Sequence, residues 1–210
     1  MFDHSSLDPV KAYFGRRIRE HGATPRGVDW NSEDSQNTRF DQLLKVISGP
    51  GPFSILDYGC GYGALVDYIA EQGLDADYNG FDIVESAVEL ANHLHPGRPR
   101  CRFFSDSTEL TACDYTVASG IFNVRGEQSI EDWTNYVLSV LHQFNDLSHK
   151  GFASNFLTKY SDTSRMRADL YYADPTYLFD YCKRNFSRNV ALLHDYQIYD
   201  FTILVRKDKP

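Results

Sequence analysis

A short apolar run that leads into three closely spaced glycines is the feature that most constrains how this chain can fold. The run over 53–57 is typical of a buried strand, glycines follow at positions 59, 61 and 63, and a helix is expected over about 64–72. Glycine has no Cβ, so the backbone can turn tightly there and approach a ligand beside the positive end of the helix. The sequence therefore predicts a strand, turn and helix unit that binds a small ligand at the turn.

Strand and helix patterns alternate along most of the chain. Strands are expected over 53–57, 77–82, 101–104, 115–119 and 151–156, and then over 189–193 and 199–205. The alternation indicates a parallel sheet with right-handed crossovers, whereas the last two strands are close enough for a hairpin. We therefore predict an α/β, doubly wound fold with a mostly parallel seven-stranded sheet, in which six strands are parallel and the last is antiparallel.

One domain over 1–210 is the organisation expected for a chain of this length. Residues 1–50 are expected to form N-terminal helices. The segment 157–177 contains several tyrosines and two arginines, and tyrosines can wall a partly apolar pocket.

Composition restricts the partners. The chain has 29 Asp and Glu against 21 Lys and Arg, a net charge of -8, which disfavours nucleic acid. No segment resembles a signal peptide or reaches the roughly 20 apolar residues of a membrane span, so we expect a cytoplasmic protein without a membrane partner. Four irregularly spaced cysteines predict reduced thiols, and no metal-ligand spacing stands out. We expect a monomer or a homodimer.

Two classes of ligand fit the glycine pattern. Gly59, Gly61 and Ala64 also satisfy the GxGxxG/A pattern of nucleotide-binding enzymes, and Asp82 can bind ribose hydroxyls in either class. Asp57 separates the two classes, because an acid just before the glycines repels a pyrophosphate and attracts an ammonium and a sulfonium.

The run Leu56-Asp57-Tyr58-Gly59-Cys60-Gly61-Tyr62-Gly63 resembles the first motif of the class I S-adenosylmethionine-dependent methyltransferases. Gly80–Asp82 after the second strand, Phe104–Ser107 after the third and the C-terminal hairpin extend the resemblance over nearly the whole chain. The resemblance implies a methyltransferase of the small-molecule type. Such an enzyme moves the methyl group of S-adenosyl-L-methionine to an O or N atom of an acceptor by in-line displacement and releases S-adenosyl-L-homocysteine. The same resemblance implies that the N-terminal helices over 1–50 cover the ligand, and it makes the segment 157–177 a candidate cover over a substrate.

The resemblance also implies roles for individual residues. Asp82 is expected to bind both ribose hydroxyls and Asp106 the adenine amino group, although both can instead cap helices or turns. Arg39 is expected to meet the cofactor carboxylate, with a solvated helix start as its alternative. The full set of expected cofactor-binding residues is Trp30, Gln36, Arg39, Asp57, Tyr58, Gly59, Cys60, Gly61, Asp82, Ile83, Asp106, Ser107, Ser119 and Ile121.

The acceptor side is less defined. The loop 119–125 lacks the Asn/Asp-Pro-Pro-aromatic motif of amino-group methyltransferases that act on nucleobases or glutamine. His194, after the sixth predicted strand, is the candidate general base, with a backbone hydrogen bond in the hairpin turn as its alternative role. Asn123 and Arg125 are candidates for positioning the acceptor. The expected substrate-binding residues are Tyr171, Tyr172, Arg165 and Tyr196.

Two other functions remain open at this point. A non-catalytic S-adenosylmethionine-binding regulatory protein fits the same motifs. A nucleic-acid methyltransferase is a weaker alternative because of the charge balance.

Overall fold

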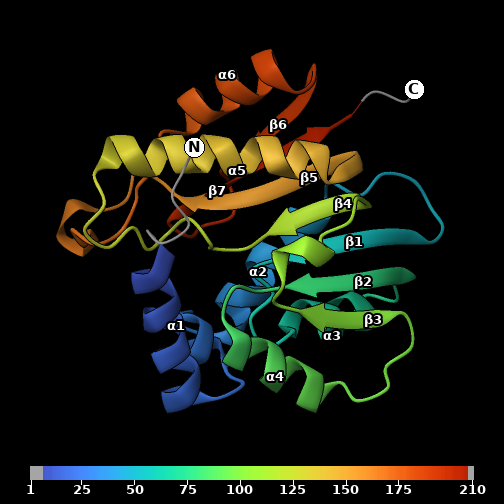
Figure 1. Cartoon of the computed structure of the whole chain (residues 1–210). Coiled ribbons are helices and arrows are strands. Elements are labelled where there is room, and N and C mark those ends of the chain that lie inside the picture. Colours follow the sequence, from blue (N-terminus) through green and yellow to red (C-terminus); the bar gives the residue numbers. More distant parts are fainter. Residues whose placement is uncertain (1–6, 208–210) are drawn as a thin grey trace.

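The computed structural model describes residues 7–207, which form one seven-stranded sheet with helices on both faces (Figure 1). The helices are α1 (Asp8–His21), α2 (Glu33–Leu44), α3 (Ala64–Glu71), α4 (Glu85–Leu94), α5 (Ile130–Asp146) and α6 (Pro175–Asn185). The strands are β1 (Phe53–Tyr58), β2 (Ala76–Phe81), β3 (Cys101–Phe104), β4 (Cys113–Ala118), β5 (Ser148–Leu157), β6 (Asn189–Leu193) and β7 (Asp200–Arg206). Short 3-10 helices lie at Pro25–Val28, Ser107–Glu109 and Thr163–Arg165.

The strand order is β3-β2-β1-β4-β5-β7-β6. β1 pairs in parallel with β2 on one side and with β4 on the other, so Asp57 lies opposite both Gly80 and Val117. β7 is antiparallel to β5 and to β6, and β6 therefore runs in the same direction as β1 to β5. The predicted doubly wound α/β fold, with six parallel strands and a reversed last strand, is confirmed.

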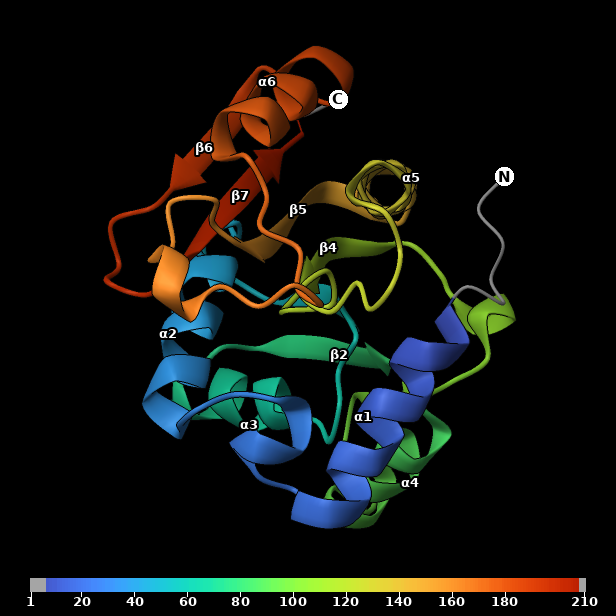
Figure 2. The ribbon, with the colours of Figure 1, turned by 90° about the vertical axis from the view of Figure 1, so that its left-hand side faces the viewer.

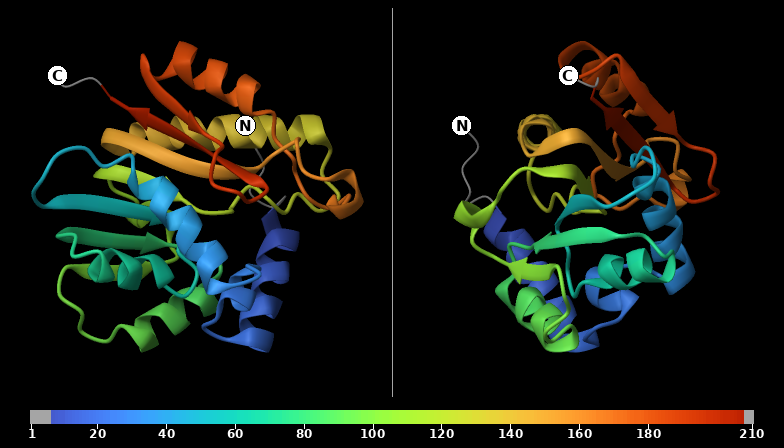
Figure 3. Two further views of the ribbon diagram at one scale, coloured as in Figure 1. Left: turned by 180° about the vertical axis from the view of Figure 1, so that it is seen from behind. Right: turned by 90° about the vertical axis from the view of Figure 1, so that its right-hand side faces the viewer.

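Two hydrophobic cores hold the helices against the sheet. Figure 2 shows α5 and α6 on one side of the sheet and α2 and α3 on the other, and Figure 3 shows α2 and α3 from behind. On the second face, Leu43 of α2, Leu65 of α3 and Ala91 of α4 are buried in one cluster with Ile55 of β1. Within each helix the apolar residues recur at helical spacing, so each helix has one apolar face that packs on this side of the sheet.

The core under α5 and α6 is rich in aromatic rings. Phe122, just beyond β4, stacks on Phe156 of β5 with ring centroids 5.1 Å apart and an interplanar angle of 4°. The indole N–H of the fully buried Trp133 in α5 donates to the backbone carbonyl of Phe122 at 2.8 Å. These contacts fix the loop that follows β4.

Two adjacent residues set the start of α6. Asp174 is the N-cap, and its carboxylate accepts from the backbone N–H groups of Thr176 at 2.9 Å and Tyr177 at 3.3 Å. Pro175 occupies the first turn, where no backbone donor is needed.

None of the helices described between residues 7 and 207 is long and apolar enough to cross a membrane.

Replacing Trp133 with Phe tests how firmly the loop after β4 is anchored. The change removes the donor to the Phe122 carbonyl and leaves a small void in a dry core, so we expect the free energy of unfolding to fall by about 2–3 kcal/mol. Urea denaturation measures it, with Ile130→Ala, an exposed change in the same helix, as the control expected within about 0.5 kcal/mol. Equal small losses in both variants would contradict the anchor.

Candidate functional site

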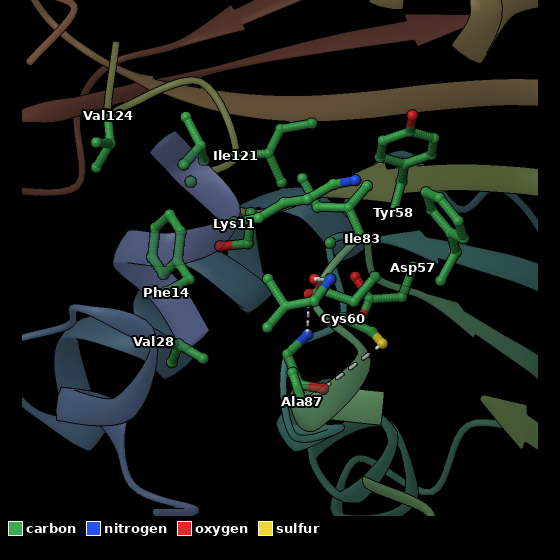
Figure 4. Close-up of a pocket in the computed structure, with 18 of the residues that line it drawn as sticks. Lys11, Phe14, Val28, Asp57, Tyr58, Cys60, Ile83, Ala87, Ile121 and Val124 are labelled. Atoms are coloured by element: carbon green, nitrogen blue, oxygen red, sulfur yellow. Dashed lines mark hydrogen bonds between the residues drawn. The ribbon is translucent and has the colours of Figure 1, made fainter. Parts of the chain in front are cut away.

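A cavity of about 740 Å³ opens at the carboxyl ends of β1, β2 and β4, the edge at which open α/β sheets bind ligands (Figure 4). Its size falls within the range of small-molecule sites. The residues predicted to bind a cofactor that line it are Trp30, Gln36, Asp57, Tyr58, Gly59, Cys60, Gly61, Asp82, Ile83, Ser107, Ser119 and Ile121. Asn123, predicted to position the acceptor, lines it as well.

The glycine turn after β1 fits closely under its neighbours. Gly59 and Gly61 have φ angles of +88° and +55°, a region that other residues rarely adopt. A Cβ on Gly59 would collide with Ile121, and one on Gly61 would lie 2.7 Å from Cγ1 of Val28. The turn therefore needs glycine for its conformation and for the close approach of the surrounding segments.

Asp82 ties this turn to the end of β2. Its Oδ2 accepts from the backbone N–H of Gly61 at 2.8 Å, and its Oδ1 accepts from that of Val84 at 2.9 Å. Burial raises the pKa of Asp82, and the two backbone donors oppose that rise. The predicted capping role is thus present, and the carboxylate also lines the cavity, where its remaining lone pairs can accept from a ligand.

Asp57 is an acid held in a dry environment. Its side chain is 3% exposed and accepts from the Tyr78 hydroxyl at 2.5 Å. Burial, with a smaller contribution from the charge of Asp82, raises the pKa of Asp57 to about 7. A cation placed beside it would favour the ionised form.

Two polar atoms beside the cavity have no hydrogen-bond partner within the described chain. They are the hydroxyl of Ser119 and Oδ1 of Asn123, and both are shielded from solvent. A buried polar atom without a partner is costly, and both residues also line the cavity.

Residues from α1 and from the segment before α2 close the cavity on the outside. Phe14 and Ile18 of α1 line it together with Val28 and Asp29. Asp29 is held in place, because it accepts from the Tyr13 hydroxyl at 2.8 Å and pairs with Arg17 at 3.1 Å. Residues 1–6 of the predicted N-terminal cover lie outside the described residues.

Arg39 does not line the cavity, contrary to the role predicted for it. Its guanidinium forms a buried pair with Asp200 of β7, with Nε to Oδ2 at 2.8 Å and Nη2 to Oδ1 at 2.9 Å. The third nitrogen, Nη1, donates to the backbone and hydroxyl oxygens of Ser35. The guanidinium carbon lies 3.9 Å from the centroid of the Trp30 ring. All three guanidinium nitrogens already donate within the protein, and both forked donors that face Asp200 are used, which leaves no such pair for a ligand carboxylate.

Asp106 also lies outside the cavity wall. Its Oδ1 accepts from the backbone N–H and the hydroxyl of Thr108, at 2.8 and 2.7 Å, and it caps the 3-10 helix that follows β3. These hydrogen bonds lower the pKa of this exposed carboxyl. Asp106 therefore caps a helix, which was the alternative predicted for it. Its neighbours Ser105 and Ser107 line the cavity.

His194 and Tyr196 are separated from the cavity by the sheet order. β6 is the edge strand, and β7 and β5 lie between it and β4. The His194 ring packs near Tyr160 and Phe201, and the Tyr196 hydroxyl lies 2.9 Å from that of Thr202. Neither His194, the candidate base, nor Tyr196, a predicted substrate-binding residue, lines the cavity.

The predicted substrate cover supports the loop after β4 from outside and contributes no residue to the cavity wall. Arg125 donates to the backbone oxygens of Gln128 and Ala168, so it joins the two segments. The Tyr171 hydroxyl lies 2.9 Å from that of Thr134, and the Tyr172 hydroxyl accepts from the Arg167 backbone at 2.9 Å. Arg165 is exposed and lies over the Tyr199 ring.

Several cavity residues were not predicted from the sequence. They include Lys11, Phe14, Val28, Asp29, Tyr62, Tyr136 and Gln143. The only signal for Phe14 was the apolar face of its helix, which does not distinguish a core from a cavity wall. No group of three metal-ligating side chains is found within residues 7–207.

Replacing Arg39 with Met tests the buried pair. Asp200 would keep its Asn155 partner but lose its cation in a site where its own side chain is 0% exposed. We expect the free energy of unfolding to fall by about 3–5 kcal/mol, measured by urea denaturation. Arg184→Met, which removes an exposed ion pair in α6, is the control expected within about 1 kcal/mol. A loss of about 1 kcal/mol or less in Arg39→Met, as in the control, would contradict the structural role of the pair.

The buried acid predicts how stability depends on pH. Between the ordinary carboxyl pKa of 3.8 and the folded value of about 7, the folded state keeps a proton on Asp57 that the unfolded state has released. Stability from this group is therefore lost as pH rises through that window, by roughly 2–4 kcal/mol. Urea unfolding of the wild type and Asp57→Asn at several pH values measures it. A difference between the two proteins that does not change with pH would contradict the prediction.

Comparisons with known proteins agree with this architecture. No family model matches the chain. Over 164 residues it is 48% identical to "Putative methyltransferase Rv1506c" of Mycobacterium tuberculosis, which covers 78% of this chain and 99% of that protein.

Two solved structures share the fold. Magnesium protoporphyrin IX methyltransferase from Synechocystis PCC 6803, with bound SAM, has a TM-score of 0.65 and 15% identity over 97% of each chain. Human N-acetylserotonin methyltransferase in complex with SAM has a TM-score of 0.65 and 14% identity, over 98% of this chain and 60% of that one. Because the mycobacterial relative is 48% identical and matches over nearly its whole length, the chain belongs to the methyltransferases. Its strand order, with a reversed last strand, is the fold predicted from the resemblance to class I enzymes.

Proposed function

We propose that the chain transfers the methyl group of S-adenosylmethionine to an oxygen or nitrogen atom of a small-molecule acceptor. The observation that supports this most directly is the cavity at the strand ends, which is lined by the glycine turn, Asp57 and Asp82. The two solved relatives were both crystallised with this methyl donor.

The groups at the turn fit the charges of this cofactor. Its amino-acid end carries an ammonium that can donate three hydrogen bonds, and the Asn123 and Ser119 oxygens lack donors. Asp57 adds a buried carboxyl whose ionised form a nearby cation would favour. The same arrangement disfavours a pyrophosphate, because two acids face the turn.

The other end of the cofactor requires a ribose partner and an apolar slot. Asp82 retains lone pairs for two hydroxyls while its backbone donors hold it in position. Ile83 and Ser107 line the neighbouring part of the wall, which suits the adenine ring. When bound, the cofactor supplies an electrophilic methyl group, and the protein positions an acceptor in line with it.

The size and closure of the site favour a small acceptor. The cavity lies under α1 and the segment before α2, so we propose that residues 7–50 act as a cover within one domain. A nucleic-acid acceptor is disfavoured by the net charge of -8. The cytoplasmic location and the monomeric or homodimeric state remain predictions from the sequence.

Asp82→Asn tests the cofactor site. The change replaces the carboxylate that accepts from the ribose hydroxyls with a neutral amide. We therefore expect the affinity for S-adenosylhomocysteine, measured by calorimetry, to weaken by about 1–3 kcal/mol. Asp106→Ala is the matched control with a smaller expected loss, since that carboxylate is exposed and bonded to Thr108. Unchanged affinity in a folded Asp82→Asn protein would leave Asp82 with a role in the turn alone.

Methyl transfer from labelled S-adenosylmethionine to a metabolite extract tests the activity itself. Label in a small organic product is the expected result. Cofactor binding without any transfer would instead favour a non-catalytic regulatory protein.

A further inference from the structure

The cavity wall opposite the strand ends is apolar. Figure 4 shows Phe14 of α1 and Val124 of the loop after β4 across the cavity from Asp57 and Tyr58. Val10 of α1 belongs to the same wall and is nearly buried. An apolar wall of this kind recognises the hydrophobic body of a ligand.

The carboxylates of the cavity already have protein partners. Asp29 is bonded to Tyr13 and paired with Arg17, Asp57 accepts from Tyr78, and Asp82 accepts from two backbone N–H groups. Within the part of the chain that the structure describes, the cavity wall contains no histidine. A neutral hydroxyl needs a base to take its proton during methylation, and a group that is already anionic does not.

Lys11 of α1 is the cationic residue of this wall over residues 7–207, and no carboxylate in that range pairs with it. Figure 4 shows its side chain extending from α1 across the cavity toward the side of Ile83 and Tyr58. An ammonium at the edge of an apolar pocket attracts an anionic ligand and forms a strong, charge-assisted hydrogen bond with it.

We propose that the methyl acceptor is a carboxylic acid with an apolar body, held by Lys11 and the α1 wall and methylated on a carboxylate oxygen. The inference rests on the proposed function and names its substrate class. A carboxylate oxygen attacks the methyl carbon and forms the new C–O bond as the carbon–sulfur bond breaks. The bonding pair stays on sulfur, which becomes the neutral thioether of S-adenosylhomocysteine. The product is a methyl ester, and no proton leaves the acceptor.

The test compares matched probes that share one apolar body. The full chain is incubated with methyl-labelled S-adenosylmethionine and 4-phenylbutanoic acid, 4-phenylbutanamide or 4-phenylbutan-1-ol, and in parallel with a metabolite extract. Mild alkali releases volatile labelled methanol from a methyl ester but not from an ether or a methylamine. We expect alkali-labile label with the acid and with the extract, and not with the amide or the alcohol.

Two results would overturn the substrate class without touching the proposed function. Label in alkali-stable products shows methylation of another group. Binding of S-adenosylhomocysteine with no alkali-labile label in any reaction shows that acids are not acceptors. Loss of S-adenosylhomocysteine binding in the wild type is a different outcome, because it contradicts the proposed function itself.

Lys11→Met tests the residue. We expect a rise of about 10-fold or more in KM for the acid, a kcat within about threefold of the wild type, and recovery in Lys11→Arg. Arg16→Met removes one charge from the same helix outside the cavity wall and is expected to leave KM unchanged. Equal KM changes in Lys11→Met and Arg16→Met would show a general charge effect and overturn the role of Lys11.

Discussion

The buried pair between Arg39 and Asp200 is the interaction on which the arrangement of the site depends. It joins α2 to the last strand, and Asn155 of β5 extends it by donating to Asp200 and accepting from the backbone N–H of Gly120. Trp30 lies on the guanidinium, and a Cβ on Gly120 would collide with its ring. A buried ion pair contributes little net stability, but its partners must meet in one geometry. The cover and the loop after β4 thus share one anchor.

The turn after β1 is held from a second direction. Asp82 is one strand away, yet its carboxylate fixes the Gly61 backbone. The same residue lines the cavity, so one side chain shapes the turn and faces the cavity. This explains why capping and binding are not exclusive alternatives for an acid at this position. Asp106 differs because its carboxylate points to Thr108 in an exposed turn, and only the capping function is left.

The fold was predictable because hydrophobic periodicity and glycines are local signals. The fifth strand was predicted to begin at 151. It begins at Ser148 because Ser148 pairs with Cys113 of β4, a contact that no local pattern indicates. The same limit explains the site. Asp57 and its neighbours could be placed at the cavity because they follow or end a predicted strand, and the carboxyl ends of parallel strands lie at one edge of the sheet. Arg39 was misassigned because its partner lies 161 positions away, and His194 because strand order, not sequence, sets its distance from the cavity.

The cavity itself arises from a short connection. β3 and β4 flank the central pair β1 and β2, so a right-handed crossover between them would run over the face that α5 covers. The connection contains only the 3-10 helix Ser107–Glu109, and no longer helix covers this part of the face. The cavity occupies this place instead, and it is lined by Ser107, Tyr136 and Gln143 together with residues of α1. α1 thus forms a wall on the side of the cavity where a crossover helix would otherwise lie, and the glycine turn after β1 forms the wall at the strand ends.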